Sequence, residues 1–215
     1  CKKHGTYVRF KPDPTVFSTV EFKRDIISDH LQESAFLMKG VHFFLIDERT
    51  GEEQQFFYEN GLVEYVSNIT SNKTPLTPIV DFAGVDEETE ISMEIALQYC
   101  NEDYNETILS YVNNVRTREG GTHESGFRTG IARAVNEFAE NNNLLHGKKL
   151  EGSDIREGIT ALISLKIPEG LLEFEGQTKG KLGTQAAVAI VQNFIYNKFT
   201  YYLTENKELA MALIK

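Results

Sequence analysis

The stretch ITALISLKIP, residues 159–168, is a short and strongly apolar run that ends in a proline. These features predict a buried β-strand over 159–167, because a proline cannot donate a hydrogen bond to a strand ladder. A loop is expected over 169–183. Thr184 is then expected to cap a long helix whose apolar residues lie on one stripe, at Val188, Val191, Ile195 and Phe199.

The segments before this strand alternate between strand and helix patterns. Apolar residues recur at every second position over 91–99, and a second strand is expected over 107–112. After the break at Gly120-Gly121, helical spacing predicts a helix over 122–140. The order strand, strand, helix, strand, loop, helix predicts an α/β or α+β domain with helices on a mixed sheet.

The N-terminal part of the chain has a different pattern. A strand, a helix and the two strands of a hairpin are expected at 8–10, 21–38, 41–46 and 54–58. These elements carry too little apolar surface for a core of their own, so they resemble the end of another domain. A short helix over 61–69 follows, and the Thr/Asn/Ser-rich stretch around Pro75 and Pro78 is the expected linker.

The composition excludes several classes of protein. The 215 residues carry a net charge of −10, whereas a protein whose main task is to coat DNA or RNA is normally basic. Any nucleic-acid contact is therefore expected to be local and made by a few arginines. No apolar run approaches the roughly 20 residues of a membrane-spanning helix. Cys1 and Cys100 are too few for a disulfide scaffold, which favours a reducing cytoplasm, and the missing initial Met favours a fragment.

The loop from Glu175 to Thr184 has the chemistry of a phosphate-binding segment. It holds three glycines, two lysines, a glutamine and two threonines just before a helix. Glycines let the backbone approach a ligand, a lysine supplies positive charge, and a helix start adds free N–H groups. The spacing is not that of a P-loop. By composition alone, a flexible surface loop is the commoner explanation.

Separated motifs along the chain resemble the B subunits of bacterial type IIA topoisomerases, the family of DNA gyrase and topoisomerase IV. They occur in the order that the family has them and cover nearly the whole chain. The motifs are GTYVRF and FLMKG (5–10 and 36–40), GGTHESGFR (120–128), DIREG with ISLK (154–158 and 163–166), and QTK followed by KLG (177–179 and 181–183).

The resemblance implies a layout of two domains. Residues 1–59 correspond to the C-terminal part of a GHKL ATPase domain, and residues 60–215 to the transducer domain. The transducer is implied to have a ribosomal-protein-like α/β fold with a left-handed βαβ crossover, a handedness that is rare among parallel connections. The sequence does not distinguish gyrase from topoisomerase IV.

The resemblance also implies roles for individual residues. Lys179 and Gln177 would contact the γ-phosphate of ATP held in the GHKL domain, where a cation and an amide stabilise charge on the transferring phosphoryl group. Thr6 would help to fix the adenine, and Val8, on the same strand face, would line its pocket. From the residues alone, a solvated threonine and a core valine are the simpler explanations.

The activity that the resemblance implies is ATP-driven passage of one DNA duplex through another. The implied partners are ATP with Mg²⁺, a DNA duplex, the A subunit, and a second B subunit that closes a dimer gate. Loss of the γ-phosphate would release the loop and let the transducer swing. The family's general-base glutamate, Mg²⁺-binding asparagine and glycine-rich lid lie upstream of Cys1. This chain is therefore expected to supply no metal ligands and not to hydrolyse ATP by itself.

Arg128 and Arg133 lie off the apolar stripe of the helix expected over 122–140. By the resemblance they are candidates for lining the cavity that holds transported DNA, and ordinary ion pairs on a solvated helix face explain them equally well. His123 is expected to hold the helix start by hydrogen bonds rather than to act in acid–base chemistry.

Two other functions stay open at this point. One is the transducer of another GHKL machine, such as a mismatch-repair or chaperone ATPase, although GGTH and QTK together are not expected there. The other is a stand-alone acidic α/β binding module with no nucleotide partner. A glutamate-to-asparagine helix and a glycine-rich lid upstream would favour an ATPase.

Overall fold

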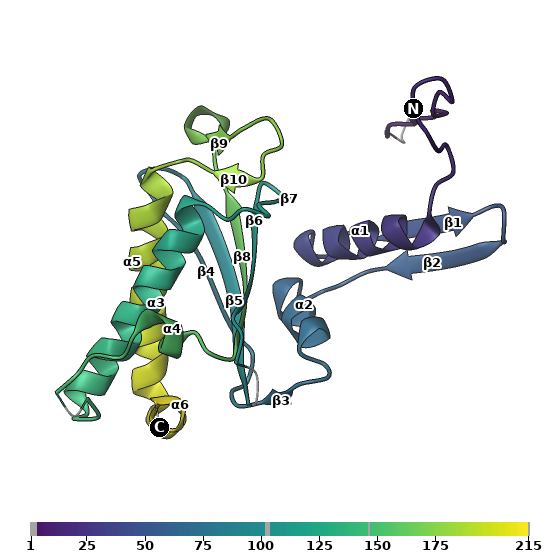
Figure 1. Cartoon of the computed structure of the whole chain (residues 1–215). Coiled ribbons are helices and arrows are strands. Elements are labelled where there is room, and N and C mark those ends of the chain that lie inside the picture. The colour runs from purple at the N-terminus through teal and green to yellow at the C-terminus, as the bar shows by residue number, and fades with distance from the viewer. Residues whose placement is uncertain (1–3, 102–103, 146, 215) are drawn as a thin grey trace.

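The computed structural model describes residues 4–101, 104–145 and 147–214, so Cys1 lies outside the described residues. A six-stranded mixed sheet forms the centre of the larger part (Figure 1). β5 is antiparallel to β4 and β8, whereas β6 is parallel to β8. The strands are β3 (Thr74–Pro75), β4 (Val80–Val85), β5 (Ser92–Asn101), β6 (Thr107–Val112), β7 (Val115–Arg116) and β8 (Ile159–Lys166).

Three predicted strands are confirmed as β5, β6 and β8. The expected linker is wrong, because β3 and β4 both pair with β5 in that stretch. The backbone N–H of Tyr99 also donates to Thr77 Oγ1 at 3.0 Å, which ties the segment between these strands to the sheet. Pro75 is tolerated because β3 is an edge strand, where a missing donor leaves no ladder bond unmade.

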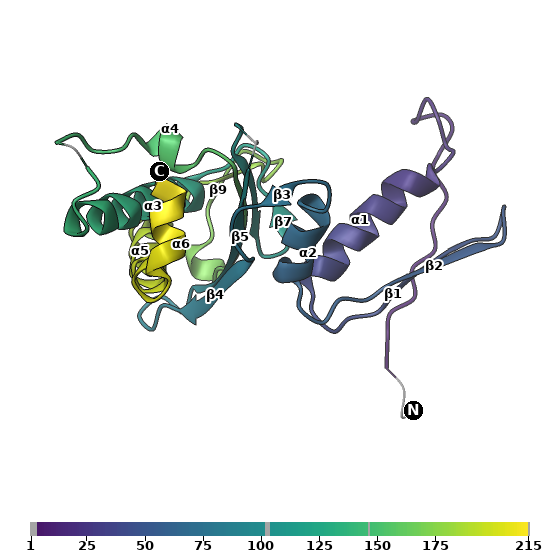
Figure 2. The ribbon, with the colours of Figure 1, turned by 90° about the horizontal axis from the view of Figure 1, so that it is seen from below.

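Helices cover both faces of the sheet, which confirms the predicted α/β (α+β) class (Figures 1 and 2). On one face lie α3 (Thr122–Asn141), α4 (Gly152–Ile155), α5 (Ala186–Glu205) and α6 (Lys207–Ile214), and on the other lies α2 (Leu62–Ile69). In β8, Ile163 packs in the core that includes α3 and α5, whereas Leu162 packs with α2. Because both faces of the sheet are covered, β8 is buried at every position except Lys166, and its apolar residues lie on both faces.

The helices α3 and α5 pack against each other at short range. A Cβ on Gly130 would lie 2.4 Å from Ile195 Cγ2, and one on Gly126 would lie 2.5 Å from the carbonyl oxygen of Val188. Only glycine leaves room for this approach. The helix predicted over 122–140 is confirmed as α3, which lies in the connection between the parallel strands β6 and β8. The left-handed sense of this crossover stays a prediction.

The N-terminal part consists of α1 (Arg24–Leu37) and a hairpin of β1 (Phe43–Asp47) with β2 (Glu52–Phe56). The predicted helix and hairpin are confirmed, with the helix starting later and the second strand starting earlier than expected. The strand expected over 8–10 is wrong. Among the described residues no strand lies beside it, and without a partner an extended segment makes no ladder. The division between residues 59 and 60 stays a prediction.

The C-terminal end of α1 joins this part to the sheet. Phe36 stacks between Tyr58 and Tyr65, with ring centroids 3.7 and 4.5 Å apart. The Glu33 carboxylate accepts a 2.5 Å hydrogen bond from the Tyr111 hydroxyl, and Lys39 pairs with Glu94. Aromatic stacking and charge therefore both link α1 to the sheet layer.

Candidate functional site

The segment predicted as a loop over 169–183 is more ordered than expected. It contains a 3₁₀ turn, η1 (Glu169–Leu171), and a small antiparallel hairpin of β9 (Phe174–Glu175) with β10 (Lys181–Leu182). Residues 176–180 form the tip of this hairpin. Figure 1 shows the hairpin at one end of the sheet, above the start of α5.

Thr184 does not cap α5, so that prediction is wrong. The N-cap position is Gln185, and no side chain caps the helix there. The Thr184 hydroxyl instead donates to the Leu171 carbonyl at 2.8 Å and accepts from the Glu173 N–H at 3.0 Å. A hydroxyl occupied by these two partners is not available to the helix N–H groups, and it fixes the base of the hairpin to η1.

The segment 119–121, at the start of the GGTH motif, forms a third strand-like edge beside β10. The Glu119 N–H donates to the Gly180 carbonyl at 2.8 Å, and the Leu182 N–H donates to the Gly120 carbonyl at 3.0 Å. Gly121 completes this ladder as a parallel bridge to Leu182. The hairpin is thus held on both sides, by β9 and by 119–121, immediately next to its tip.

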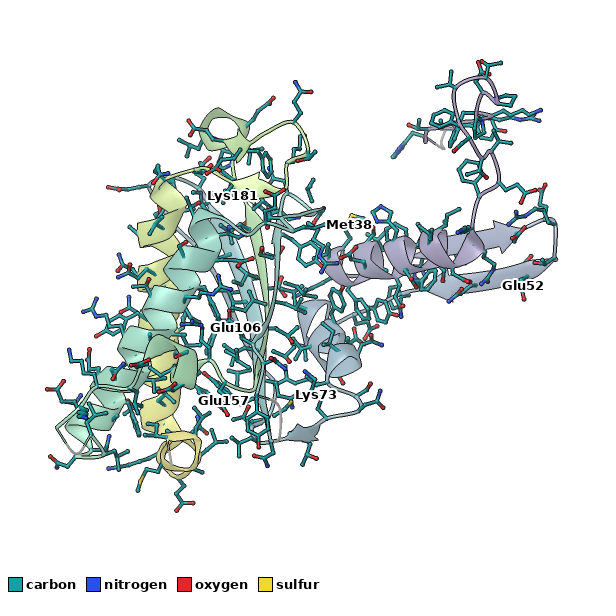
Figure 3. All side chains as sticks on the ribbon, viewed as in Figure 1. Met38, Glu52, Lys73, Glu106, Glu157 and Lys181 are labelled. Carbon is teal, nitrogen blue, oxygen red and sulfur yellow. The ribbon has the colours of Figure 1, made fainter. Side chains whose placement is uncertain are left out.

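The tip carries the two residues predicted to contact a phosphate. Gln177 and Lys179 are exposed, and Lys179 has a positive φ of 54°. The Lys179 ammonium lies 5.9 Å from the centroid of the Phe174 ring, and no carboxylate of the described residues pairs with it. Lys181, labelled in Figure 3, is by contrast paired with Glu175 at 2.9 Å. The tip therefore presents one cation that has no anionic partner among the described residues.

Thr6 and Val8 lie in the coil before α1, and both are exposed. Figures 1 and 2 show this coil beyond α1, well away from β9 and β10. The structure thus brings Gln177 and Lys179 together but does not bring Thr6 or Val8 to them. The adenine roles of Thr6 and Val8 stay predictions.

The arginines predicted to face DNA differ in their surroundings. The Arg128 guanidinium donates to Glu124 at 3.1 Å and to Glu106 at 2.9 Å. Arg133 is exposed and its guanidinium carbon lies 4.0 Å above the centroid of the Tyr196 ring. Arg128 is therefore held by two carboxylates, whereas Arg133 meets an aromatic face.

Arg128 belongs to a chain of polar contacts beneath the GGTH segment. Glu106, which precedes β6 and is labelled in Figure 3, also accepts a 2.5 Å hydrogen bond from Arg156, in the DIREG motif. Burial raises the pKa of the Glu106 carboxyl, but the hydrogen bonds and charges of Arg156 and Arg128 outweigh that effect and lower it. Glu124 accepts a 2.6 Å hydrogen bond from the Ser110 hydroxyl. Sequence reasoning missed both carboxylates, although Glu124 lies in the GGTHESGFR motif and Glu106 directly precedes the strand expected over 107–112.

His123 is fully buried, in agreement with a structural role. Its Nε2 lies 3.0 Å from Thr117 Oγ1, and its Nδ1 is buried without a hydrogen-bond partner among the described residues. Burial lowers the pKa of His123 to about 4. A histidine that is neutral at pH 7 and reaches no solvent is not placed for proton transfer to a ligand.

The buried imidazole predicts a pH-dependent stability. Because the folded-state pKa lies below the unfolded value of about 6.5, His123 destabilises the fold as pH falls from 6.5 towards 4, by on the order of 3 kcal/mol in total. We expect His123→Gln to flatten the decline in unfolding free energy between pH 7.5 and 5, measured by urea titration. The exposed His30 supplies the control, and a His123→Gln slope equal to that of His30→Gln would contradict the assignment.

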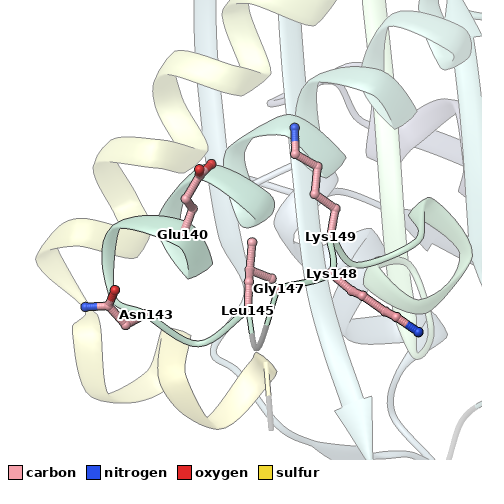
Figure 4. Close-up of a pocket in the computed structure, with 6 residues that line it drawn as sticks. All are labelled: Glu140, Asn143, Leu145, Gly147, Lys148 and Lys149. Atoms are coloured by element: carbon pink, nitrogen blue, oxygen red, sulfur yellow. The ribbon is translucent and has the colours of Figure 1, made fainter.

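Two hollows lie on the α3 side of the molecule. A cleft of about 390 Å³ borders the hairpin and is lined by residues that include Gly120, Gly121, Glu124, Arg128 and Lys181. The other, about 440 Å³, lies at the far end of α3 and is lined by Glu140, Asn143, Leu145, Gly147, Lys148 and Lys149 (Figure 4). The second hollow contains none of the predicted site residues.

Over residues 4–101, 104–145 and 147–214, no three His, Cys, Asp or Glu side chains group to hold a metal ion. No helix in these ranges combines the length and apolar character needed to cross a membrane.

Known proteins match this chain over its whole length. The family model described as DNA gyrase B matches residues 61–215. The B subunit of DNA topoisomerase 4 from Enterococcus faecalis is 49% identical over 218 residues, which cover 100% of this chain and 31% of that protein. The B subunit of DNA topoisomerase 4 from Bacillus subtilis is 49% identical over 216 residues, which cover 100% of this chain and 32% of that protein.

Solved structures agree with the sequence relatives. The 43K ATPase domain of Thermus thermophilus gyrase B, solved with an aminocoumarin, has a TM-score of 0.79 and 30% identity over 95% of this chain and 54% of that one. The B subunit of DNA gyrase from Myxococcus xanthus has a TM-score of 0.83 and 25% identity over 95% of this chain and 64% of that one. This chain spans about a third of the length of its curated relatives (31% and 32%). With a family model that covers residues 61–215, the chain belongs to the DNA gyrase B family.

Proposed function

We propose that this chain is the part of a type IIA topoisomerase B subunit that couples ATP binding and hydrolysis to DNA strand passage. The observation that carries the proposal is the hairpin tip, where Lys179 is exposed and paired with no described carboxylate, on a base held from both sides. A cation without an anionic partner, on a rigid support, is placed to meet an anion from outside its own fold. The two topoisomerase 4 relatives favour that branch of the family.

The proposed anion is the γ-phosphate of ATP. Lys179 would place a positive charge beside the transferring phosphoryl group, and the Gln177 amide would donate hydrogen bonds to it. Both contacts strengthen as negative charge accumulates on the phosphoryl oxygens. Mg²⁺ would accompany ATP, and we assign it no ligand in this chain. When the γ-phosphate leaves, the tip loses its anion, so the part that carries it is free to swing.

Residues 1–59 are proposed to be the end of the GHKL domain that holds the nucleotide. They expose several large apolar side chains, which supports packing against further polypeptide: Tyr7, Val8, Phe10, Phe44 and Ile46 are each more than half exposed. Thr6 and Val8 would then take their places at the adenine. The start of the family match at residue 61 supports a boundary near 59/60.

The partners proposed for the whole protein are a DNA duplex, a second B subunit and an A subunit, in the cytoplasm. Arg133 keeps an exposed guanidinium and is proposed to face DNA. Arg128, the second arginine predicted for that role, would have to leave two carboxylates to reach a phosphate.

The chain as described is not expected to bind ATP tightly. Thr6 and Val8 lie in a coil away from the hairpin, so the proposed adenine and γ-phosphate contacts are not assembled into one pocket. Calorimetry of this chain with ATP and Mg²⁺ should show no saturable heat up to about 1 mM. Micromolar binding would show that the nucleotide pocket lies elsewhere.

Strand passage by the full-length protein tests the proposed function. Together with its A subunit, it should change the linking number of a closed circular plasmid when ATP is present and not when ADP replaces ATP. Topoisomer gels resolve the products. A full-length protein that leaves the topoisomer distribution unchanged, while hydrolysing ATP, would contradict a role in strand passage.

A further inference from the structure

A chain of alternating charges runs under the base of the hairpin. Arg156 donates to Glu106, Arg128 donates to both Glu106 and Glu124, and Ser110 completes the shell of Glu124. The contacts are 2.5 to 3.1 Å long. The negative charges of the two carboxylates equal the positive charges of the two guanidiniums. Removing one of these four groups therefore leaves its neighbour with an uncompensated charge.

This chain of charges touches the strand that holds the hairpin. A Cβ on Gly120 would lie 2.9 Å from Glu124 Oε2, so the carboxylate lies directly against the Gly120 backbone. The Gly120 carbonyl in turn accepts the Leu182 N–H, and Glu119 donates to Gly180, the residue after Lys179. Only two contacts therefore separate the Glu124 carboxylate from the hairpin that carries the tip.

Arg128 makes more ion pairs within the chain than we expect of an arginine whose role is to bind DNA. Its two carboxylate partners come from its own helix, one turn earlier, and from Glu106 before β6. The negative charges of Glu124 and Glu106 beside this guanidinium would weaken its attraction for a DNA phosphate. The local charge therefore favours an internal role for Arg128.

We infer that Glu124 and Arg128 are positioning residues for the hairpin tip. Glu124 fixes the 119–121 strand, Arg128 holds Glu124 in place, and Glu106 with Arg156 anchors Arg128 to the DIREG motif. The inference rests on the proposed function of Lys179, because it assigns the two residues to the placement of that side chain. It also gives the GGTH and DIREG motifs a shared physical task.

Two readouts on the full-length protein test this inference. Amide hydrogen exchange of 119–121 and 176–182 reports the hairpin and its anchor, and steady-state kinetics separates kcat from KM for ATP. Glu124→Gln keeps the size of the side chain and removes its charge. We expect exchange in both segments to become faster, kcat to fall about tenfold, and KM to change less than about twofold, because misplacement acts on the transferring group.

Matched variants separate positioning from other effects. Glu140→Gln removes an exposed carboxylate of the same helix and should change neither readout. Arg128→Gln should reproduce Glu124→Gln, and the double variant should cost less than the product of the two single effects, because the unmatched charge is gone. Melting temperatures show that each variant is folded.

Three results would overturn the inference. The first is unchanged exchange in both segments for folded Glu124→Gln and Arg128→Gln. The second is faster exchange with an unchanged kcat, when Lys179→Ala does lower turnover. The third is an Arg128→Gln protein that binds DNA more weakly but keeps its exchange rates. If Lys179→Ala leaves turnover unchanged, the proposed function fails instead, and the exchange data still test whether Glu124 holds the hairpin.

Discussion

Lys179→Ala is expected to lower ATP turnover by the full-length protein about 10²- to 10³-fold, because it removes a positioned cation from the transferring phosphoryl group. The side chain is exposed and unpaired with any described carboxylate, so its loss breaks no ion pair within the described fold. Stability should therefore change little. Steady-state hydrolysis of ATP at saturating substrate measures the effect on kcat directly.

The same hairpin offers a matched control for this substitution. Lys181→Ala removes an identical side chain two residues away, where the ammonium is already occupied by Glu175 at 2.9 Å. It should change turnover by no more than about twofold, because an exposed ion pair contributes little. Equal losses in the two variants would show that overall charge in the hairpin, and not a contact of Lys179, supports hydrolysis.

Gly121→Ala is expected to destabilise the chain by about 3 kcal/mol or more. Gly121 has a φ of 139°, and a Cβ there would lie 2.5 Å from the carbonyl oxygen of Leu182 and 2.6 Å from its nitrogen. Both atoms are backbone, so the side chain cannot be accommodated by a rotamer change. The 119–121 strand would have to separate from β10. Urea unfolding of the chain measures the loss.

Gly176→Ala separates backbone strain from steric conflict. Gly176 also has a positive φ, 79°, but nothing lies within 4 Å of a Cβ built on it. Its replacement should cost only about 1 kcal/mol, the conformational penalty. If Gly121→Ala costs no more than Gly176→Ala, the close contact between the GGTH segment and β10 does not exist in solution.

The elements that could be predicted from the sequence are those whose spacing of apolar residues matches the side chains that the fold buries. The strand over 107–112 and the helix from 122 both begin where expected, because apolar periodicity and a glycine break mark the same boundaries. β8 was predicted from a strongly apolar run that ends in a proline, and its burial between two helix layers explains that run. Phosphate binding by 175–184 stays a prediction that rests on the family resemblance, because its residue types alone fit a flexible surface loop better.

The parts that could not be predicted depend on contacts between distant segments. β3, β4 and the small hairpin have weak patterns of their own and exist because β5 and 119–121 supply partners. Thr184 matches a helix cap in sequence, yet its hydroxyl bonds to residues 171 and 173. The partners of Arg128 lie 4 and 22 residues away, and spacing on one helix reveals only the first.

Amide exchange of residues 176–180 in the full-length protein tests most directly whether the hairpin tip contacts the γ-phosphate. A non-hydrolysable ATP analogue should slow exchange at the tip by about tenfold or more relative to ADP, because only the analogue supplies the third phosphate. Lys179→Ala should abolish this difference. Equal exchange with the analogue and with ADP in the unsubstituted protein would contradict phosphate contact by the tip.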